Sequence, residues 1–580
     1  MKKYRKLTES EIQELRHAAV SAENWSLIDV SQDFETSQLQ QCRLEGIVRI
    51  DSQATIIRSR VRNYHIGQGS LITGVTALEC RHRSSFGNGV EVATINENGG
   101  RTIRIHDRLS SGEAYMAAVY RHRPKLIERL DKIAQNIADQ RLNTMGQVGT
   151  HCRLMGARFI REVSIGDRVE IDGASMLENG TILNDAQIGV DVKAYDFIVA
   201  EAAQIDNGTI LERCFVGESC ILDKSFTAAD SVFFANSHCE NGEAASIFAG
   251  PYTVTHHKSS LLIAGLFSFF NAGSGSNQSN HLFKSGAVHQ AIHLRGCKFA
   301  SSAYIMSPAL EGAFTMVMGH HSFHHNTSIF PYSYLVERDQ KSFLMPGANL
   351  TSYGSVRDVE KWQKRDRRKV FRDVISFEEY NPYIIQSMME GLDQLHALED
   401  ADPDAATYVY DKVQIRQSSL RRGITLYNKT IAAALGAMIE RGEDTPNYDG
   451  SGRWTDLGGQ YITRNKVEEL IEKIEADQIT TADQIHNVLR VFHAHYSEYA
   501  RSWAEDVLAS MLGHRPSQKE LQEVVESGRN IHSQMRQMTD QDRQRDSSVE
   551  MSVGYGFDTA TQEERLADYC SVRGLNLSDL

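Results

Sequence analysis

The sequence predicts a mainly β protein in which a long parallel β-solenoid is followed by an all-α C-terminal region. Two observations carry this prediction. Between Val163 and Phe226 the chain repeats an aliphatic–polar pattern every six residues. After Arg357 apolar residues recur at helical spacing, with charged residues between them. A stack of β-coils followed by amphipathic helices accounts for both patterns.

The six-residue pattern is clearest in four consecutive units that begin at Ile165, Ile171, Leu177 and Leu183, and it resumes at Ile205 after a slip. This period fits neither an α-helix nor an antiparallel meander, but it fits short strands that stack on the same strand of the next coil. The units resemble the hexapeptide-repeat superfamily, which implies a left-handed parallel β-helix with three units per coil. The alternative is chance alternation in an ordinary β protein.

The first half of the chain is expected to hold three parts. Residues 1–45 form an N-terminal helical lead-in, because Thr8 and Glu11 make a capping-box pattern before apolar residues. The β-helix domain covers 46–355. Within it, a helical pattern at about 111–145 predicts a helical insertion, which either walls an active site or serves packing or oligomerisation.

The second half is expected to be helical throughout. Residues 356–441 form a helical extension with long amphipathic segments. Gly442–Gly452 has the composition of a linker. Residues 453–580 form a C-terminal helical domain that ends in a polar tail.

Composition limits the classes of function. The chain has 580 residues, 41% of them hydrophobic and 24% charged, which is typical of a soluble globular protein. A net charge of −13 argues against broad binding of nucleic acid. No 18-residue apolar run or signal-peptide core occurs, so we expect no membrane span. The eight cysteines are scattered without a CxxC pair, which favours reduced thiols in the cytoplasm.

The candidate site lies between Tyr252 and His325, where nine of the 22 histidines fall among many other polar residues. One hypothesis is acyl transfer, in which a histidine removes the proton of a hydroxyl or amine that attacks a thioester. His257 is the first candidate for this base and His289 the second, and Lys258 or Lys284 could stabilise the thioester oxyanion. A purely structural role remains the alternative for each. The resemblance to hexapeptide-repeat acyltransferases implies a coenzyme A thioester as co-substrate and no permanently bound cofactor.

The second hypothesis is a metal site built from the histidine pairs. Neighbouring residues of a strand point to opposite faces, so each pair offers at most one ligand. His256, His320 and His324 are the candidates, and three imidazoles would leave one position open for water. The γ-class carbonic anhydrases carry zinc on a solenoid of the kind that this sequence resembles.

Polar residues between Asn271 and Lys298 are the candidates for substrate binding. Backbone N–H groups of the Gly/Ser/Asn run from Asn271 to Asn280 could form a nest for phosphate, and the cations that follow support this hypothesis. A flexible loop is the alternative. The predicted substrate-binding residues are Asn271, Ser274, Asn277, Gln278, Asn280, His281, Lys284, Gln290, Arg295 and Lys298.

A basic run from Lys361 to Lys369 follows the solenoid. It could hold the phosphates of coenzyme A or a nucleotide, with Trp362 stacking on a base. The alternative is a solvated helix face, paired with Asp358, Glu360 and Asp366.

Three segments, Asn271–His281, His289–Gln290 and Arg295–Lys298, together resemble one large uncharacterised family of Bacteroides-type bacteria. Its members combine a trimeric acyltransferase-like β-helix with helical appendages, and the resemblance covers most of residues 45–370. We therefore expect a cytoplasmic homo-oligomer, a trimer by analogy. Its expected function is to move an acyl group from acyl-CoA or an acyl carrier to a sugar, nucleotide-sugar or similar polar, phosphorylated acceptor. A metal-dependent enzyme and a non-catalytic ligand-binding or assembly protein are the alternatives.

Overall fold

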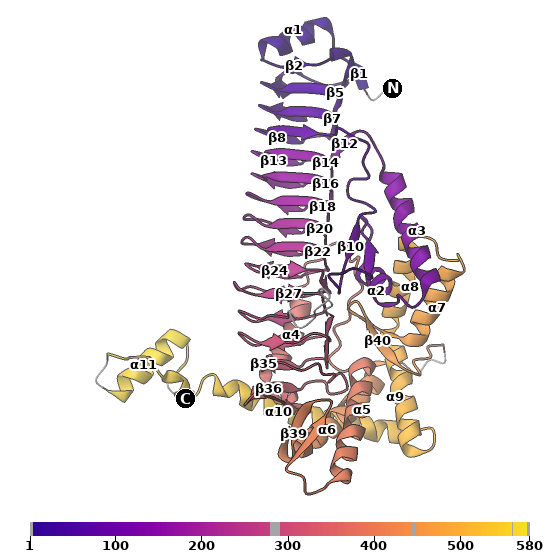
Figure 1. The fold of residues 1–580 in the computed structure, drawn as a ribbon, viewed down its shortest axis with the longest axis vertical. Helices are drawn as coiled ribbons and strands as arrows, with labels where there is room; N and C mark the ends of the chain where they lie inside the picture. The colour runs from indigo at the N-terminus through magenta and orange to yellow at the C-terminus, as the bar shows by residue number, and fades with distance from the viewer. Residues whose placement is uncertain (1–3, 279–289, 444–446, 559–560, 577–580) are drawn as a thin grey trace.

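The computed structural model describes residues 4–278, 290–443, 447–558 and 561–576. Parallel strands stack along the long axis of an elongated molecule, with the N terminus at one end and most C-terminal helices beside the other (Figure 1). The predicted parallel β-helix, its helical insertion and the helical C-terminal region are confirmed.

One coil of the solenoid is 17 residues long in its regular part. Strand β14 (Phe159–Ile165) pairs in register with β16 (Met176–Ile182), so that Phe159 lies beside Met176. β14 bends at Glu162, where φ is +48°, and thereby forms two sides of the coil. The third side is β15 (Glu170–Asp172). The chain therefore winds around three sides.

The corners explain why the six-residue pattern slips. Residues with positive φ at Glu162, Arg168 and Gly173 mark three successive corners, six and then five residues apart, and the next corner, Asn179, follows after six. One side is therefore a residue shorter than a hexapeptide unit. The unit expected to begin at Leu183 begins instead at Ile182, whose side chain is fully buried while Leu183 is half-buried.

Aliphatic ladders form the interior. Ile160, Leu177, Ala194 and Leu211 occupy one inward position in four successive coils, and each is at most 1% exposed. Full burial of one such Leu or Ile side chain contributes roughly 1.5–3 kcal/mol. This ladder runs through β18 (Lys193–Val199), β20 (Ile210–Val216), β22 (Thr227–Phe233), β24 (Glu243–Ala245) and β27 (Leu261–Ile263). A second inward row runs from the other end of β22 into β25 (Phe248–Ala249) and β28 (Gly265–Phe267).

The N-terminal end already belongs to the solenoid. Helix α1 (Glu9–His17) has the predicted Thr8–Glu11 capping box. β1 (Tyr4–Lys6) pairs antiparallel with β3 (Ile28–Ser31), and β3 pairs parallel with β5 (Arg43–Ile50). The β-structure thus begins well before residue 46.

The insertion is longer than the helical segment predicted at about 111–145. The chain leaves the solenoid after β9 (Ala77–Glu79) and returns at β12 (Gly146–Val148). Between them lie a hairpin, β10 (Glu91–Ala93) and β11 (Thr102–Arg104), and the helices α2 (Ser111–Val119) and α3 (Pro124–Arg141). Apolar residues of the hairpin and α2 pack on an outward apolar row of the coils, which comprises Ile198, Phe215, Val232 and Phe248. Packing is therefore one role of the insertion.

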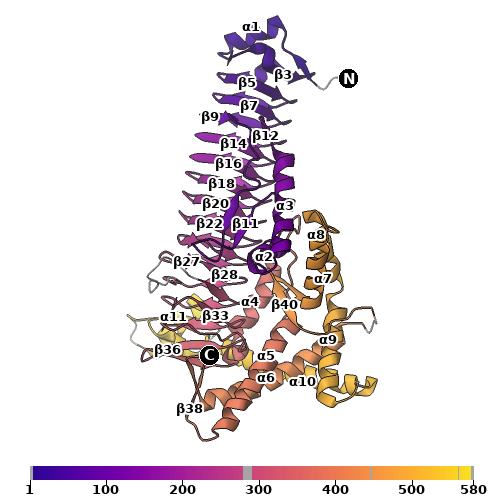
Figure 2. The same cartoon turned by 45° about the vertical axis from the view of Figure 1, so that its right-hand side comes forward.

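The C-terminal region lies along the flank and the far end of the solenoid (Figure 2). A hairpin of β38 (Thr407–Tyr410) and β39 (Val413–Arg416) pairs with β37 (Lys341–Met345), the last solenoid strand. A second hairpin joins β40 (Trp454–Leu457) to β41 (Gln460–Thr463). The helices are α4 (Tyr353–Lys364), α5 (Pro382–Ala401), α6 (Gln417–Arg441), α7 (Arg464–Glu475), α8 (Ala482–Ala494), α9 (Tyr496–Leu512), α10 (Gln518–Arg545) and α11 (Gln562–Arg573). Across the described residues, no helix has both the length and the apolar composition needed to cross a bilayer.

The segment after α4 ties this helix to the solenoid. Glu218 of the solenoid accepts the backbone N–H groups of Lys369 and Val370. The buried carboxylate of Asp373 accepts the N–H of Ala235 from the solenoid at 2.9 Å and that of Ser111 from the insertion at 2.7 Å. α4 is thereby held against one side of the β-helix.

Candidate functional site

A groove of about 520 Å³ lies between the third side of the solenoid and the end of α4. Its solenoid wall is one outward row of residues that the strand register brings side by side. In this row Ile221 pairs with His238, His238 with Val254, Val254 with Asn271, and Asn271 with Lys298. The strands are β21 (Ile221–Asp223), β23 (His238–Glu240), β26 (Val254–Thr255), β29 (Asn271–Ala272) and β31 (Lys298–Phe299). Five successive coils therefore build one wall.

The opposite wall is strongly basic. Lys361, Lys364, Arg365 and Arg367 line it, together with the single carboxylate Asp358. Asp358 is already engaged, because Lys298 forms an ion pair with it and Lys361 lies 3.5 Å from it. Among the described residues, no carboxylate forms an ion pair with Lys364, Arg365 or Arg367. The groove therefore carries positive charge that a bound anion could neutralise.

The positive charge of the groove affects the pKa of Lys361. Burial lowers the pKa of its ammonium group, and the neighbouring cations Arg365 and Lys298 lower it further against the opposing effect of Asp358. The basic run pairs with the predicted acids only in part. Glu360 Oε1 lies 3.8 Å from Nη1 of Arg536, which is outside the basic run.

Trp362 lies at the bottom of the groove. Its side chain is only 7% exposed and packs edge-on against Phe269, with ring centroids 4.6 Å apart. Tyr252, Phe269 and Phe270 also line the groove, which gives it an apolar floor. Trp362 thus anchors α4 to the solenoid, and little of its ring is left exposed to stack on a base.

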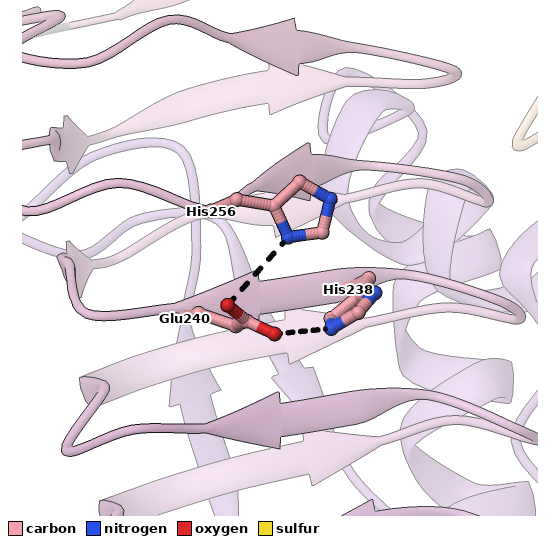
Figure 3. Close-up of side chains that lie close together, drawn as sticks. All are labelled: His238, Glu240 and His256. Carbon is pink, nitrogen blue, oxygen red and sulfur yellow. Dashed lines mark hydrogen bonds and ion pairs between the residues drawn. The ribbon is translucent and has the colours of Figure 1, made fainter. Parts of the chain in front are cut away.

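Two histidines and a glutamate meet on the solenoid wall of the groove (Figure 3). His238 and Glu240 are two apart on β23 and point to the same side. His256 directly follows β26, on the next coil. His238 Nε2 lies 2.9 Å from Glu240 Oε1, and His256 Nδ1 lies 3.9 Å from Glu240 Oε2. We call these three residues the outer cluster.

The electrostatics of the outer cluster keep the imidazoles neutral. Burial lowers the pKa of His238, although Glu240 acts in the opposite sense. Burial and the neighbouring His238 lower the pKa of His256 to about 4. For Glu240, burial raises the pKa, but hydrogen bonds from Lys224 and His238 outweigh it and hold the pKa below its ordinary value. Near neutral pH the cluster is therefore one carboxylate between two uncharged imidazoles.

The predicted catalytic residues lie outside this cluster. His257 and Lys258 are exposed in the turn that follows His256. His289 lies outside the described residues. Of the proposed metal ligands, His256 belongs to the outer cluster, while His320 is exposed on β35 (His320–His321), several coils away. His324 contacts the carbonyl of Pro308 at 3.2 Å and belongs to neither the groove nor the cluster.

The predicted substrate-binding residues are divided by the fold. Asn271 and Lys298 lie side by side in the groove. Gln290 accepts hydrogen bonds from the Arg101 guanidinium at 3.0 and 2.7 Å. Arg295 is 2% exposed and lies 3.6 Å from the centre of the Phe269 ring. It donates to the carbonyl of Gly459 at 3.1 Å and so joins the solenoid to the C-terminal region. Asn280, His281 and Lys284 lie outside the described residues.

The Gly/Ser/Asn run does not form the expected nest in its described part. Asn271, Gly273 and Asn277 donate their N–H groups to carbonyls of the next coil, so these groups are used by the solenoid. Ser274 is a half-buried corner residue, and Gln278 is fully buried. Glycine is required at two of these positions, because Gly275 has a φ of +71° and a Cβ at Gly273 would lie 2.5 Å from the carbonyl oxygen of Phe299.

A second histidine–glutamate cluster lies inside the solenoid. His293 Nδ1 contacts one oxygen of Glu311, and His325 Nε2 lies 2.9 Å from the other. All three are at most 4% exposed, and the His293 ring stacks on Phe267 and Phe270. We call these residues the inner cluster. Burial opposes ionisation of Glu311, but His293 and His325 outweigh it and hold the pKa of Glu311 below its ordinary value.

Sequence reasoning missed His238 and Glu240, which lie upstream of the predicted segment. One signal was available. Glu240 and His256 are 16 residues apart, close to the 17-residue coil, and His238 precedes Glu240 by two. With the correct coil length, a His-x-Glu pair and a histidine one coil later would have been placed together.

The chain is a β-solenoid protein with a basic groove between the solenoid and the end of α4, and a histidine–glutamate cluster lies at this groove. The chain belongs to the family described as a domain of unknown function (DUF4954), whose model matches residues 53–399. A second domain of unknown function (DUF6819) matches residues 438–579. An uncharacterized protein of Treponema pallidum (strain Nichols) is 22% identical over 609 residues, which cover 88% of this chain and 82% of that protein. The expected link to Bacteroides-type bacteria stays a prediction.

Proposed function

We propose that this protein is an enzyme that transfers an acyl group from a coenzyme A-type thioester to a polar acceptor bound in the groove. The observation that carries the proposal is that one groove combines unpaired cations on one wall with a carboxylate-held, neutral imidazole on the other. The cations suit a phosphorylated carrier, and the imidazole suits a general base.

Phosphate binding is assigned to the end of α4 and the segment after it. Lys364, Arg365 and Arg367 are exposed and free of acidic partners among the described residues. Arginine guanidinium groups match phosphate oxygens in two parallel hydrogen bonds. A coenzyme A molecule carries a diphosphate and a further phosphate, and the apolar floor of Tyr252 and Phe269 can take its less polar parts.

His238 is the base in this proposal. Ionised Glu240 only accepts hydrogen bonds, so His238 must donate through Nε2, which leaves the lone pair on Nδ1. As the acceptor hydroxyl or amine attacks the thioester carbonyl, its proton moves to Nδ1. The C–S bond then breaks while the new C–O or C–N bond remains, and the imidazolium returns the proton to the leaving thiolate. The residue predicted for this role, His257, is replaced by His238.

Binding and turnover test the two halves of the proposal separately. Isothermal titration of the full chain with coenzyme A should show binding that weakens with salt. The double variant Arg365→Glu/Arg367→Glu should weaken it at least about tenfold, since two attractive charges become repulsive. Lys193→Glu, an exposed charge reversal on another side of the solenoid, is the matched control. Equal binding by both variants would contradict the groove assignment.

Turnover is followed as thiol release from acetyl-CoA and longer acyl-CoAs against a panel of sugars and nucleotide-sugars. His238→Gln should lower kcat by about 10²–10⁴-fold while coenzyme A affinity is retained. Full activity in this variant would rule out His238 as the base.

The cellular setting and assembly complete the proposal. We propose a cytoplasmic homo-oligomer, a trimer by analogy with the hexapeptide-repeat acyltransferases. All eight cysteines are free and buried, which supports a reducing compartment. Light scattering on a sizing column gives the subunit number, and a monomer would remove the trimer from the proposal.

A further inference from the structure

The geometry of the outer cluster points to a second role. We propose that His238, Glu240 and His256 form a binding site for a divalent transition-metal ion, with Zn²⁺ as the reference ion. The ligand atoms of the three side chains all lie within 4.8 Å of one another, and no other group of three in the described residues does so. Two imidazoles and one carboxylate are a ligand set that suits zinc.

The distances are close to those that a zinc ion requires. Bonds of about 2.0–2.2 Å at tetrahedral angles place neighbouring ligand atoms about 3.4 Å apart. Glu240 Oε1 lies 2.9 Å from His238 Nε2, and Glu240 Oε2 lies 3.9 Å from His256 Nδ1. Small side-chain rotations bring both distances to about 3.4 Å. The rings meet edge to face with centroids 4.4 Å apart, and a ligand nitrogen of each ring lies within 4.8 Å of the other. The backbone register, which is rigid, needs no change.

Accessibility separates this cluster from the inner one. The His256 side chain is 42% exposed and that of His238 is 29% exposed, and both line the groove. An ion can therefore enter, and a fourth position remains open toward the groove for water or a phosphate oxygen. In the inner cluster Glu311 and His293 are fully buried and already bonded to each other.

Lys224 occupies the position of a competing cation. Its ammonium group lies 2.6 Å from Glu240 Oε2. A metal ion must displace this contact or share the carboxylate with it. Because 53% of the Lys224 side chain is exposed, the ammonium can swing into solvent at small cost.

Metal binding would regulate the proposed reaction, and this consequence rests on the proposed function. An ion on His238 Nε2 forces the ring proton onto Nδ1, because a neutral imidazole carries one proton. Nδ1 then has no lone pair to accept the proton of the acceptor. Zn²⁺ should therefore inhibit acyl transfer at concentrations that fill the site.

The test measures metal binding directly, without turnover. The chelator-treated full chain is titrated with ZnCl₂ by calorimetry, and the metal content is checked by native mass spectrometry. One ion per chain is expected. His256→Ala and Glu240→Gln should each weaken binding at least about tenfold, while His257→Ala, next to the cluster but outside it, should bind as the parent chain does.

Lys224→Met provides a test in the opposite direction. Removing the competing ammonium should tighten zinc binding several-fold, which loss of folding cannot imitate. No zinc binding by the parent chain, or equal weakening by His256→Ala and His257→Ala, would overturn the site. Zinc binding in a protein that shows no turnover would support the site and reject only the proposed reaction. Zinc binding with undiminished turnover would overturn the regulatory consequence.

Discussion

The outer and inner clusters contain the same residue types, one glutamate between two histidines, in opposite environments. His238 and His256 line a groove, with Glu240 close to both, whereas His293, Glu311 and His325 point into the core of the solenoid. In the core, His293 occupies the inward ladder position that Phe267 fills one coil earlier. The comparison shows that composition does not distinguish a site from a structural network. What distinguishes them is whether the histidine side chains can be reached from solvent.

The direction of the pKa shifts follows the same division. In the outer cluster burial lowers the pKa of His256 to about 4. In the inner cluster burial also lowers the pKa of His325, but Glu311 outweighs it and the net pKa is raised. Glu311 lies 2.9 Å from His325, whereas Glu240 lies 3.9 Å from His256, so only the closer carboxylate outweighs the burial of its imidazole.

The largest expected effect is on stability. Glu311→Gln leaves two histidines in the core without their carboxylate, which should destabilise the solenoid by about 3–5 kcal/mol. Glu240→Gln removes a partly exposed contact and should change stability by less than about 1 kcal/mol. Urea denaturation followed by circular dichroism measures both. Similar losses in the two variants would erase the distinction between the clusters.

A second effect concerns activity. His238→Gln should remove turnover with little change in the urea midpoint. His293→Gln should lower the midpoint, while the kcat of the folded fraction stays near that of the parent. Thiol release measured at temperatures where both variants are folded provides the comparison. A large loss of kcat in His293→Gln at full folding would place the inner cluster in the reaction.

The smallest effect is on pH dependence. The raised pKa of His325 stabilises the fold below about pH 6.5, and this stabilisation is lost as pH rises through the folded-state value. The lowered pKa of Glu311 contributes stability above its ordinary value and loses it as pH falls. The difference in stability between the parent and Glu311→Gln should therefore be greatest between about pH 4.5 and 6.5.

Urea midpoints of the parent chain and Glu311→Gln between pH 4.5 and 8 check this window. The lowered pKa of His256 acts with the opposite sign, since it reduces stability as pH falls from about 6.5 toward 4. Glu240→Gln therefore serves as the control, because it should not reproduce the window. A difference between parent and Glu311→Gln that grows steadily toward pH 8 would contradict the assignment.

Much of the fold could be predicted from local pattern. Inward aliphatic residues such as Ile165 and Ile171 recur at nearly fixed spacing, because each coil must fill the same interior position. The Thr8–Glu11 cap and the helical periodicity after Arg357 are equally local signals. The short side of each coil was missed, since a five-residue side differs from a hexapeptide by one corner residue.

Residue spacing alone predicts a solenoid with helices after it, and residue composition places the polar chemistry toward the later coils. Which polar residues lie together depends on the folded arrangement. His256 joins Glu240 because coil length sets which residues become neighbours, and Arg365 and Arg367 face them because α4 docks on that side. Arg295, by contrast, is directed into the interface with the C-terminal region. Hydrophobic spacing is a property of the chain, whereas the meeting of distant charges depends on register and docking.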